Sequence, residues 1–142
     1  MKNVYLDANI LVDFSNPQRQ CHTHAISIIT HCLKENISLF TSCDIITTLY
    51  YIDSKKSKES ALNTIRKINQ FVKIIDFSNF EVAQTCELMA NNDTFTDLED
   101  TIQYILAKKV SCDCIISNDK QFNSPDITLM TSALFCDTMG LL

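Results

Sequence analysis

The stretch Asn3-Val4-Tyr5-Leu6-Asp7 places three apolar residues in a row and ends on a carboxylate. An apolar run without polar alternation is typical of a strand buried on both faces, as in a parallel sheet that is covered by helices. In such sheets, function gathers at the carboxyl ends of the strands. The stretch therefore predicts a fold class and marks Asp7 as the first residue to consider for a site.

The rest of the chain repeats this pattern of short apolar runs and longer amphipathic segments. Strands are predicted at residues 37–40, 72–75, 114–116 and 127–130. Helices are predicted from residue 8 to the break at Asn16-Pro17, at 24–34, from a Thr41-Ser42 cap to about 55, at 58–70, 80–89 and 96–109, and near the C-terminus. Thr96 and Glu99 have the spacing of a capping box for the helix at 96–109. Strands that alternate with helices predict a parallel sheet flanked by helices.

The chain has the size and composition of one globular domain. Its 142 residues contain one glycine and two prolines, with no linker or repeat, so a single domain over 1–142 is expected. No apolar run approaches the roughly 18 residues of a membrane span. Asp7 interrupts the N-terminal apolar run too early for a signal peptide. We therefore expect a soluble, cytoplasmic protein without a membrane partner.

The cysteines and the charge balance restrict the chemistry. Seven cysteines occur at irregular spacings and mostly within apolar segments, which favours reduced core thiols over a zinc site. The net charge of −5 argues against a protein that binds nucleic acid through phosphate contacts alone. That objection weakens if several acids share a metal site, because bound cations cancel their charge locally.

Three aspartates stand where such a site would form. Asp7 ends the first strand, Asp119 lies just beyond the fourth, and Asp100 falls in the first turn of the preceding helix. If the first and fourth strands are neighbours, the three carboxylates converge. Oxygen-only ligands suit Mg²⁺ or Mn²⁺, and such an ion supports phosphodiester hydrolysis by an activated water. Each aspartate also has an ordinary alternative role as a turn former or helix cap.

Three motifs resemble those of one known family. Residues 4–13 (VYLDANILVD), 97–104 (DLEDTIQY) and 115–122 (IISNDKQF) are similar, in order and spacing, to the motifs of PIN-domain ribonucleases, and most closely to those of VapC-type toxins. The similarity extends over essentially the whole chain. It implies a three-layer α/β/α sandwich with a central parallel sheet.

The resemblance also implies roles and partners. Asp7, Asp100 and Asp119 would be the catalytic, metal-binding acids for Mg²⁺ or Mn²⁺. Asn9 and Ser117 would support them by hydrogen bonds to the carboxylates or to water on the metal. The protein would be an endoribonuclease acting on RNA, restrained by a cognate antitoxin protein and assembled as a homodimer through apolar helical faces in its N-terminal half.

One departure from the family pattern concerns an acid on the helix after the second strand. The matching position is Thr48, which carries no charge. Asp44, one turn earlier on roughly the same face, is a candidate substitute or a helix cap, and the cap is the favoured interpretation. Asp97 is a reserve ligand three residues before Asp100.

Surface residues and competing functions stay open at this point. The lysines at 55, 56 and 58 are interpreted as a solvated cluster, whereas Lys120 is better placed to contact RNA. Tyr50 and Tyr51 are interpreted as core or dimer contacts rather than base-stacking residues. A PIN module that binds RNA or a protein without cleavage is the main alternative. A receiver-like signalling domain fits poorly, because no acid adjoins Asp7.

Overall fold

A computed structural model describes residues 1–142 and contains one five-stranded sheet in the order β3-β2-β1-β4-β5, parallel throughout. The strands are β1 (Asn3–Leu6), β2 (Ser38–Ser42), β3 (Val72–Ile75), β4 (Cys114–Ile116) and β5 (Thr128–Met130). All five lie within two residues of the predicted positions. The first and fourth strands are neighbours, with Leu6 beside Ile116. The condition for the three aspartates to converge is therefore met.

Seven helices connect and cover the strands, as the alternating pattern predicted. They are α1 (Ala8–Ser15), α2 (His22–Lys34), α3 (Cys43–Asp53), α4 (Lys58–Phe71), α5 (Asn79–Asn91), α6 (Leu98–Lys109) and α7 (Ser132–Met139). The break predicted at Asn16-Pro17 is confirmed, because α1 ends at Ser15.

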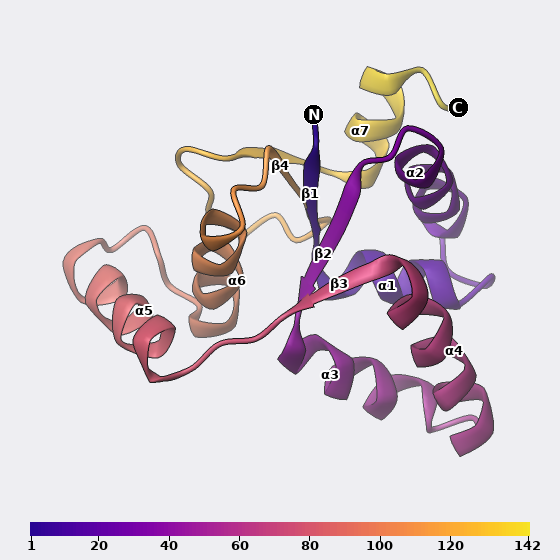
Figure 1. Ribbon diagram of the computed structural model, residues 1–142, viewed down its shortest axis with the longest axis horizontal. Coiled ribbons are helices and arrows are strands. Elements are labelled where there is room, and N and C mark those ends of the chain that lie inside the picture. Colours follow the sequence, from indigo (N-terminus) through magenta and orange to yellow (C-terminus); the bar gives the residue numbers. More distant parts are fainter.

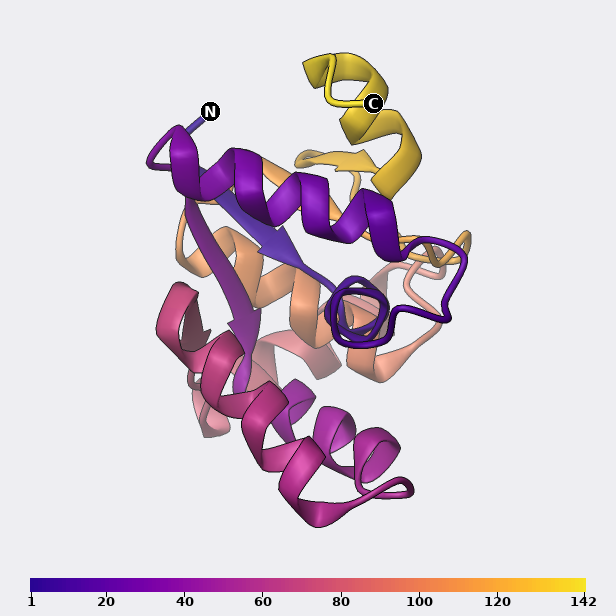
Figure 2. The same cartoon turned by 90° about the vertical axis from the view of Figure 1, so that its right-hand side faces the viewer.

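Two hydrophobic cores lie on opposite faces of the sheet. Val4 and Leu6 of β1 pack in a cluster with α1, α2, α3, α4 and α7, whereas Tyr5 packs with α6 in a second cluster. Successive residues of a strand point to opposite faces, so this short run serves both cores. Figure 1 shows α5 and α6 on one side of the sheet and α1, α2, α4 and α7 on the other, and Figure 2 shows α2 running across the sheet. The predicted α/β/α sandwich is confirmed.

The expected caps are partly wrong. Asp97, not Thr96, is the N-cap of α6, and its side chain accepts from the Asp100 backbone N–H at 2.9 Å. Glu99 thus stands at the second position of the helix, out of register for a capping box. The capping box of this chain opens α5 instead, between Ser78 and Glu81. The predicted cap at Ser42 is in place as a residue but makes no side-chain capping bond.

Four of the seven cysteines lie in the cores, as predicted. All seven are free thiols, and burial raises the pKa of Cys32, Cys112 and Cys114 to about 12, which leaves these thiols protonated and inert. The helices are too short or too polar for any of them to traverse a lipid bilayer.

Candidate active site

Asp7 lies at the carboxyl end of β1, where the strand passes into α1. Its backbone N–H donates to the Ile116 carbonyl at 3.1 Å, which continues the β1–β4 ladder by one residue. Its Oδ1 accepts from the Ala8 N–H at 2.6 Å and so caps α1. Its Oδ2 accepts from the Ser117 hydroxyl at 2.6 Å and from Asn9 Nδ2 at 2.9 Å. The hydrogen bonds expected from Asn9 and Ser117 are thus present, and the carboxylate is held in one orientation.

The loop after β4 brings Asp119 to the same edge of the sheet. The Ser117 hydroxyl, besides donating to Asp7, accepts from the Asp119 N–H at 3.1 Å. Asp119 Oδ1 accepts from the Gln121 N–H at 2.9 Å, so this acid also has the turn-forming role that its sequence context allowed. Asp119 itself is exposed. Its second carboxylate oxygen has no partner within the chain.

The third acid, Asp100, reaches the site from the first turn of α6. Asp7, Asp97, Asp100 and Asp119 all line one pocket of about 360 Å³, together with Glu99. Thr48 is not among the residues that line it. Five carboxylates thus border a single hollow at the carboxyl edge of the sheet.

Crowding and burial raise the pKa of two of the central acids, Asp100 and Asp7. The pKa of Asp100 is raised to about 7, first by burial and then by the charges of Asp7, Asp97, Asp119 and Glu99. Burial also raises the pKa of Asp7, against the lowering effect of its hydrogen bonds. Like charges that cannot separate favour protonation or a bound cation. The pocket is thus electrostatically suited to a divalent ion.

Sequence reasoning missed two pocket residues on α6. Gln103, one turn after Asp100, is buried and lines the pocket; its side chain acts to lower the pKa of Asp7, and its Oε1 has no partner. Glu99 was assigned to a capping box, yet it lines the pocket, and its pKa is raised by burial and by the charges of Asp44 and Asp7. The signal for Gln103 was its spacing of three from Asp100, which places both on one helix face.

Asp44 lies close to the site, although it does not line the pocket. Its pKa is raised by burial and by the charge of Asp7, and its carboxylate accepts from the Ser42 hydroxyl. Asp44 occupies the second position of α3, so the favoured interpretation of it as the helix cap is wrong; Ser42 is the N-cap residue. Thr48, one turn later, is half-buried.

The chemistry of these donors fits a hard cation, although no finished ligand cage is present. Carboxylate oxygens and the unpartnered Oε1 of Gln103 are the ligands that Mg²⁺ and Mn²⁺ prefer. No group of three or more His, Cys, Asp or Glu side chains already stands in a metal-holding arrangement. Repulsion keeps unneutralised carboxylates apart. Asp119 is exposed and Asp100 half-buried, which leaves both side chains room to turn toward an ion.

A larger hollow of about 720 Å³ lies between α5 and α6 and is mainly apolar. Its two lysines are already paired, Lys109 with Glu81 at 3.2 Å and Lys108 with Asp126 at 2.6 Å. Glu81 also belongs to the capping box of α5. With its charges engaged in the fold, this hollow is a weaker candidate for chemistry than the acid pocket.

The basic and aromatic residues considered for RNA contacts are exposed to solvent. Lys120 and the lysines at 55, 56 and 58 are exposed. Tyr51 is 68% and Tyr50 37% exposed, so the interpretation of these tyrosines as core residues is wrong. Lys55 Nζ lies 4.9 Å from the ring centre of Tyr51, a cation–π contact.

The comparisons with known proteins agree with this architecture. Residues 3–121 match the family model described as PIN domain, and the chain therefore belongs to the PIN-domain family. It is 42% identical over 141 residues to Ribonuclease VapC1 of Aquifex aeolicus (strain VF5). The aligned region covers 99% of this chain and 98% of that protein. Within the family, it belongs with the VapC-type proteins.

Solved structures share the fold at low sequence identity. The DNA-bound VapBC of Salmonella typhimurium matches with a TM-score of 0.71 at 15% identity, over 93% of this chain and 99% of that one. VapBC2 of Rickettsia felis, bound to a DNA fragment from the promoter, matches with a TM-score of 0.70 at 20% identity, over 89% of this chain and 96% of that one. VapC20 of Mycobacterium tuberculosis, described as a Sarcin-Ricin loop cleaving toxin, matches with a TM-score of 0.66 at 11% identity, over 84% of this chain and 92% of that one.

Proposed function

We propose that this protein is a metal-dependent endoribonuclease that acts as the toxin of a toxin–antitoxin pair. The observation that carries the proposal is the single pocket shared by Asp7, Asp100 and Asp119, in a chain 42% identical to a ribonuclease of the VapC type. The three aspartates would hold Mg²⁺ or Mn²⁺.

The chain's own residues have distinct tasks in this reaction. When bound, the divalent ion supplies Lewis-acid activation of a phosphodiester and of the attacking water. Asp7 is fixed for its part by Ser117 and Asn9, whose hydrogen bonds orient the carboxylate. Gln103 lines the pocket together with Asp7, and its buried Oε1 has no partner within the chain. Asp100 and Asp119 would turn their carboxylates toward the ion.

The test is cleavage of an RNA mixture with and without Mg²⁺ or Mn²⁺. We expect cleavage that EDTA abolishes and that Asp100→Asn reduces by about a hundredfold or more, since loss of a ligand removes the ion's fixed position. Asp137→Asn, which changes an exposed carboxylate on α7, is the matched control and should cleave like the wild type. Cleavage that persists in EDTA would contradict the proposal.

A module that binds RNA or a protein without cutting is the second candidate. It is favoured by Thr48, which stands where related toxins usually carry an acid, and by the absence of a finished metal cage. Calorimetric titration with Mn²⁺ separates the two functions. A nuclease gives a binding heat that Asp7→Asn removes, whereas a wild type without any metal-dependent heat would support the binding module.

Partners follow from the same comparison. Two of the solved structures named above are described as VapBC, and we propose that this chain also has a cognate antitoxin protein and forms a homodimer in the cytoplasm. The exposed Tyr50, Tyr51 and Ile52 of α3 offer an apolar face for a protein contact. Sedimentation analysis at micromolar concentration tests the homodimer, and a strictly monomeric protein would contradict it.

A further inference from the structure

One basic residue borders the acid pocket. Arg19, in the turn between α1 and α2, is the only cationic side chain among the residues that line it. Its Nε donates to Asp13 Oδ1 at 2.5 Å, and 43% of its side chain is exposed. The terminal guanidinium nitrogens make no hydrogen bond within the chain. Arg19 therefore presents free donors beside five carboxylates.

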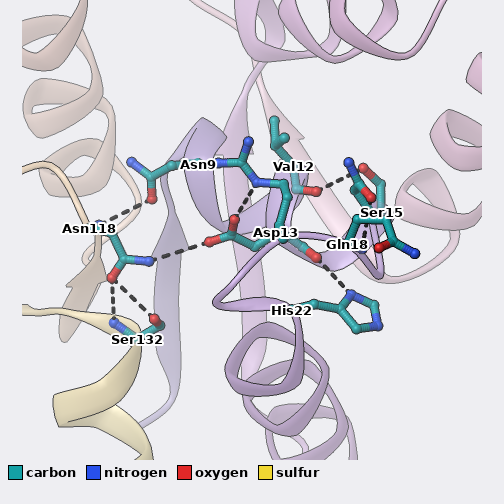
Figure 3. A network of polar contacts seen from close by, with 10 residues as sticks. Asn9, Val12, Asp13, Ser15, Gln18, His22, Asn118 and Ser132 are labelled. Atoms are coloured by element: carbon teal, nitrogen blue, oxygen red, sulfur yellow. Dashed lines mark hydrogen bonds and ion pairs between the residues drawn. The ribbon is translucent and has the colours of Figure 1, made fainter. Parts of the chain in front are cut away.

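Asp13, the ion-pair partner of Arg19, is itself buried and fixed by other contacts. Its side chain is only 6% exposed, and its second oxygen accepts from Asn118 Nδ2 at 3.4 Å. His22 Nδ1 donates to the Asp13 backbone carbonyl at 2.8 Å. Figure 3 shows Asp13 at the centre of this network, with Asn118 on one side and His22 on the other. A buried carboxylate so fixed gives the guanidinium a defined direction.

The same network reaches the acid that is proposed to bind metal. The Asn118 N–H donates to Asn9 Oδ1 at 3.1 Å, and Asn9 Nδ2 donates to Asp7 at 2.9 Å. Asn118 Oδ1 in turn accepts from the Ser132 N–H at 2.9 Å and from its hydroxyl at 3.1 Å. The support of Arg19 and the support of Asp7 therefore belong to one hydrogen-bonded frame.

We propose that Arg19 is a substrate-binding residue whose terminal nitrogens bind a backbone phosphate of RNA at the rim of the pocket, with Asp13 as its positioning residue. This inference rests on the proposed function. A chain of net charge −5 with an acidic pocket repels a polyanion, so a fixed cation at the rim is needed to bring the phosphates close. A planar guanidinium with two free nitrogens matches a phosphate in bidentate geometry.

The first experiment measures steady-state cleavage of a fluorophore–quencher RNA in Mn²⁺. Arg19→Ala should raise KM by about tenfold or more and change kcat less, because a phosphate contact contributes to binding before and during the reaction. Arg19→Lys should recover part of the loss, since it keeps the positive charge but not the planar guanidinium that binds a phosphate through two nitrogens. Arg66→Ala is the matched control: Arg66, the other arginine of the chain, is exposed on α4 and contacts Asn63.

A second variant separates binding from folding. Arg19→Ala leaves the buried Asp13 charge without its cation, which lowers stability for purely structural reasons. The double variant Arg19→Ala/Asp13→Asn removes that charge as well. It should regain thermal stability yet keep the raised KM. A merely structural role for Arg19 predicts the opposite, with KM restored together with stability.

RNA affinity measured without cleavage distinguishes this inference from the proposed function. In an Asp100→Asn background, fluorescence anisotropy with labelled oligouridine should show weaker binding on adding Arg19→Ala. The slope of log Kd against log salt should fall by about 0.7, the value for one phosphate contact on a single strand. If Arg19→Ala matches Arg66→Ala in KM and in salt slope, the inference is overturned while wild-type cleavage still supports the nuclease. Arg19-dependent RNA binding without any wild-type cleavage would support the inference and overturn the nuclease.

Discussion

Asp7 serves a helix and a candidate metal site with the same carboxylate. One oxygen caps α1, and the other receives the Ser117 hydroxyl and the Asn9 amide. The two interpretations that its position after a strand allowed, N-cap and ligand, therefore do not exclude each other. The capping bond fixes the carboxylate at the helix start, and its remaining lone pairs are available to the pocket. Rigid support of this kind is what a ligand needs from its neighbours.

Removal of one supporting hydroxyl tests that view. Ser117→Ala deletes one of the two 2.6 Å hydrogen bonds to Asp7 without changing the charge, so the carboxylate loses orientation and its pKa rises further. We expect Mn²⁺ affinity to fall by roughly tenfold or more, in the range known for outer-shell partners of metal ligands. Isothermal titration calorimetry measures the change. Ser60→Ala, at an exposed position of α4, is the control, and equal affinities for the two variants would contradict the supporting role.

Helix α6 carries three pocket residues on its first two turns, so its start decides where they lie. Asp97 caps the helix through the Asp100 N–H, which couples the cap to the acid that it precedes. The pocket lining includes Asp97, so a role as a reserve ligand and a role as a cap make different predictions for substitutions at this position.

Two substitutions at the start of α6 separate these roles. Asp97→Ala removes the cap and should lower the free energy of unfolding by about 1 kcal/mol in urea denaturation. Asp97→Ser keeps a capping oxygen and should retain most of that stability. Metal affinity should follow stability if Asp97 only caps, and should fall in both variants if it is a ligand. Thr96→Ala should be neutral, because the exposed Thr96 is not the N-cap; a loss of stability there would restore the capping box first expected.

The elements show which features a sequence can predict. Strands such as residues 3–6 and 114–116 were predicted because each is a short apolar run bounded by polar residues, a local property. That β1 and β4 are neighbours was not predicted but only stated as the condition for the three aspartates to converge, because strand order depends on the whole sheet. Arg19 and Asp13 escaped notice because their ion pair arises where the chain folds back after Asn16-Pro17. Glu99 was misassigned because a capping-box spacing says nothing of which residue is the N-cap.

At the scale of the whole molecule, the acid pocket opposes folding unless it is neutralised. The chain has a net charge of −5, and five of its carboxylates border one hollow. Mutual repulsion there is a stored cost that a cation would relieve, and a divalent ion bound only by the folded state stabilises it by mass action. Marginal stability makes such a local cost measurable in the global transition.

The pH dependence of stability should report this cost. Asp100 has a pKa raised from 3.8 to about 7 in the folded, metal-free protein, so folding favours its protonated form. Its stabilising contribution is therefore complete below about pH 4 and is lost as the pH rises toward 7. In EDTA, we expect Tm to decline across this window from the Asp100 contribution, and Asp100→Asn, which cannot ionise, to show a flatter decline.

Metal ligands must be deprotonated to bind, so the rise in Tm on adding Mn²⁺ should be larger near pH 8 than near pH 5.5, by roughly several degrees. Differential scanning fluorimetry over this range measures both effects. Equal slopes for wild type and Asp100→Asn, or a Mn²⁺ effect that is independent of pH, would mean that Asp100 does not ionise against its neighbours on metal binding.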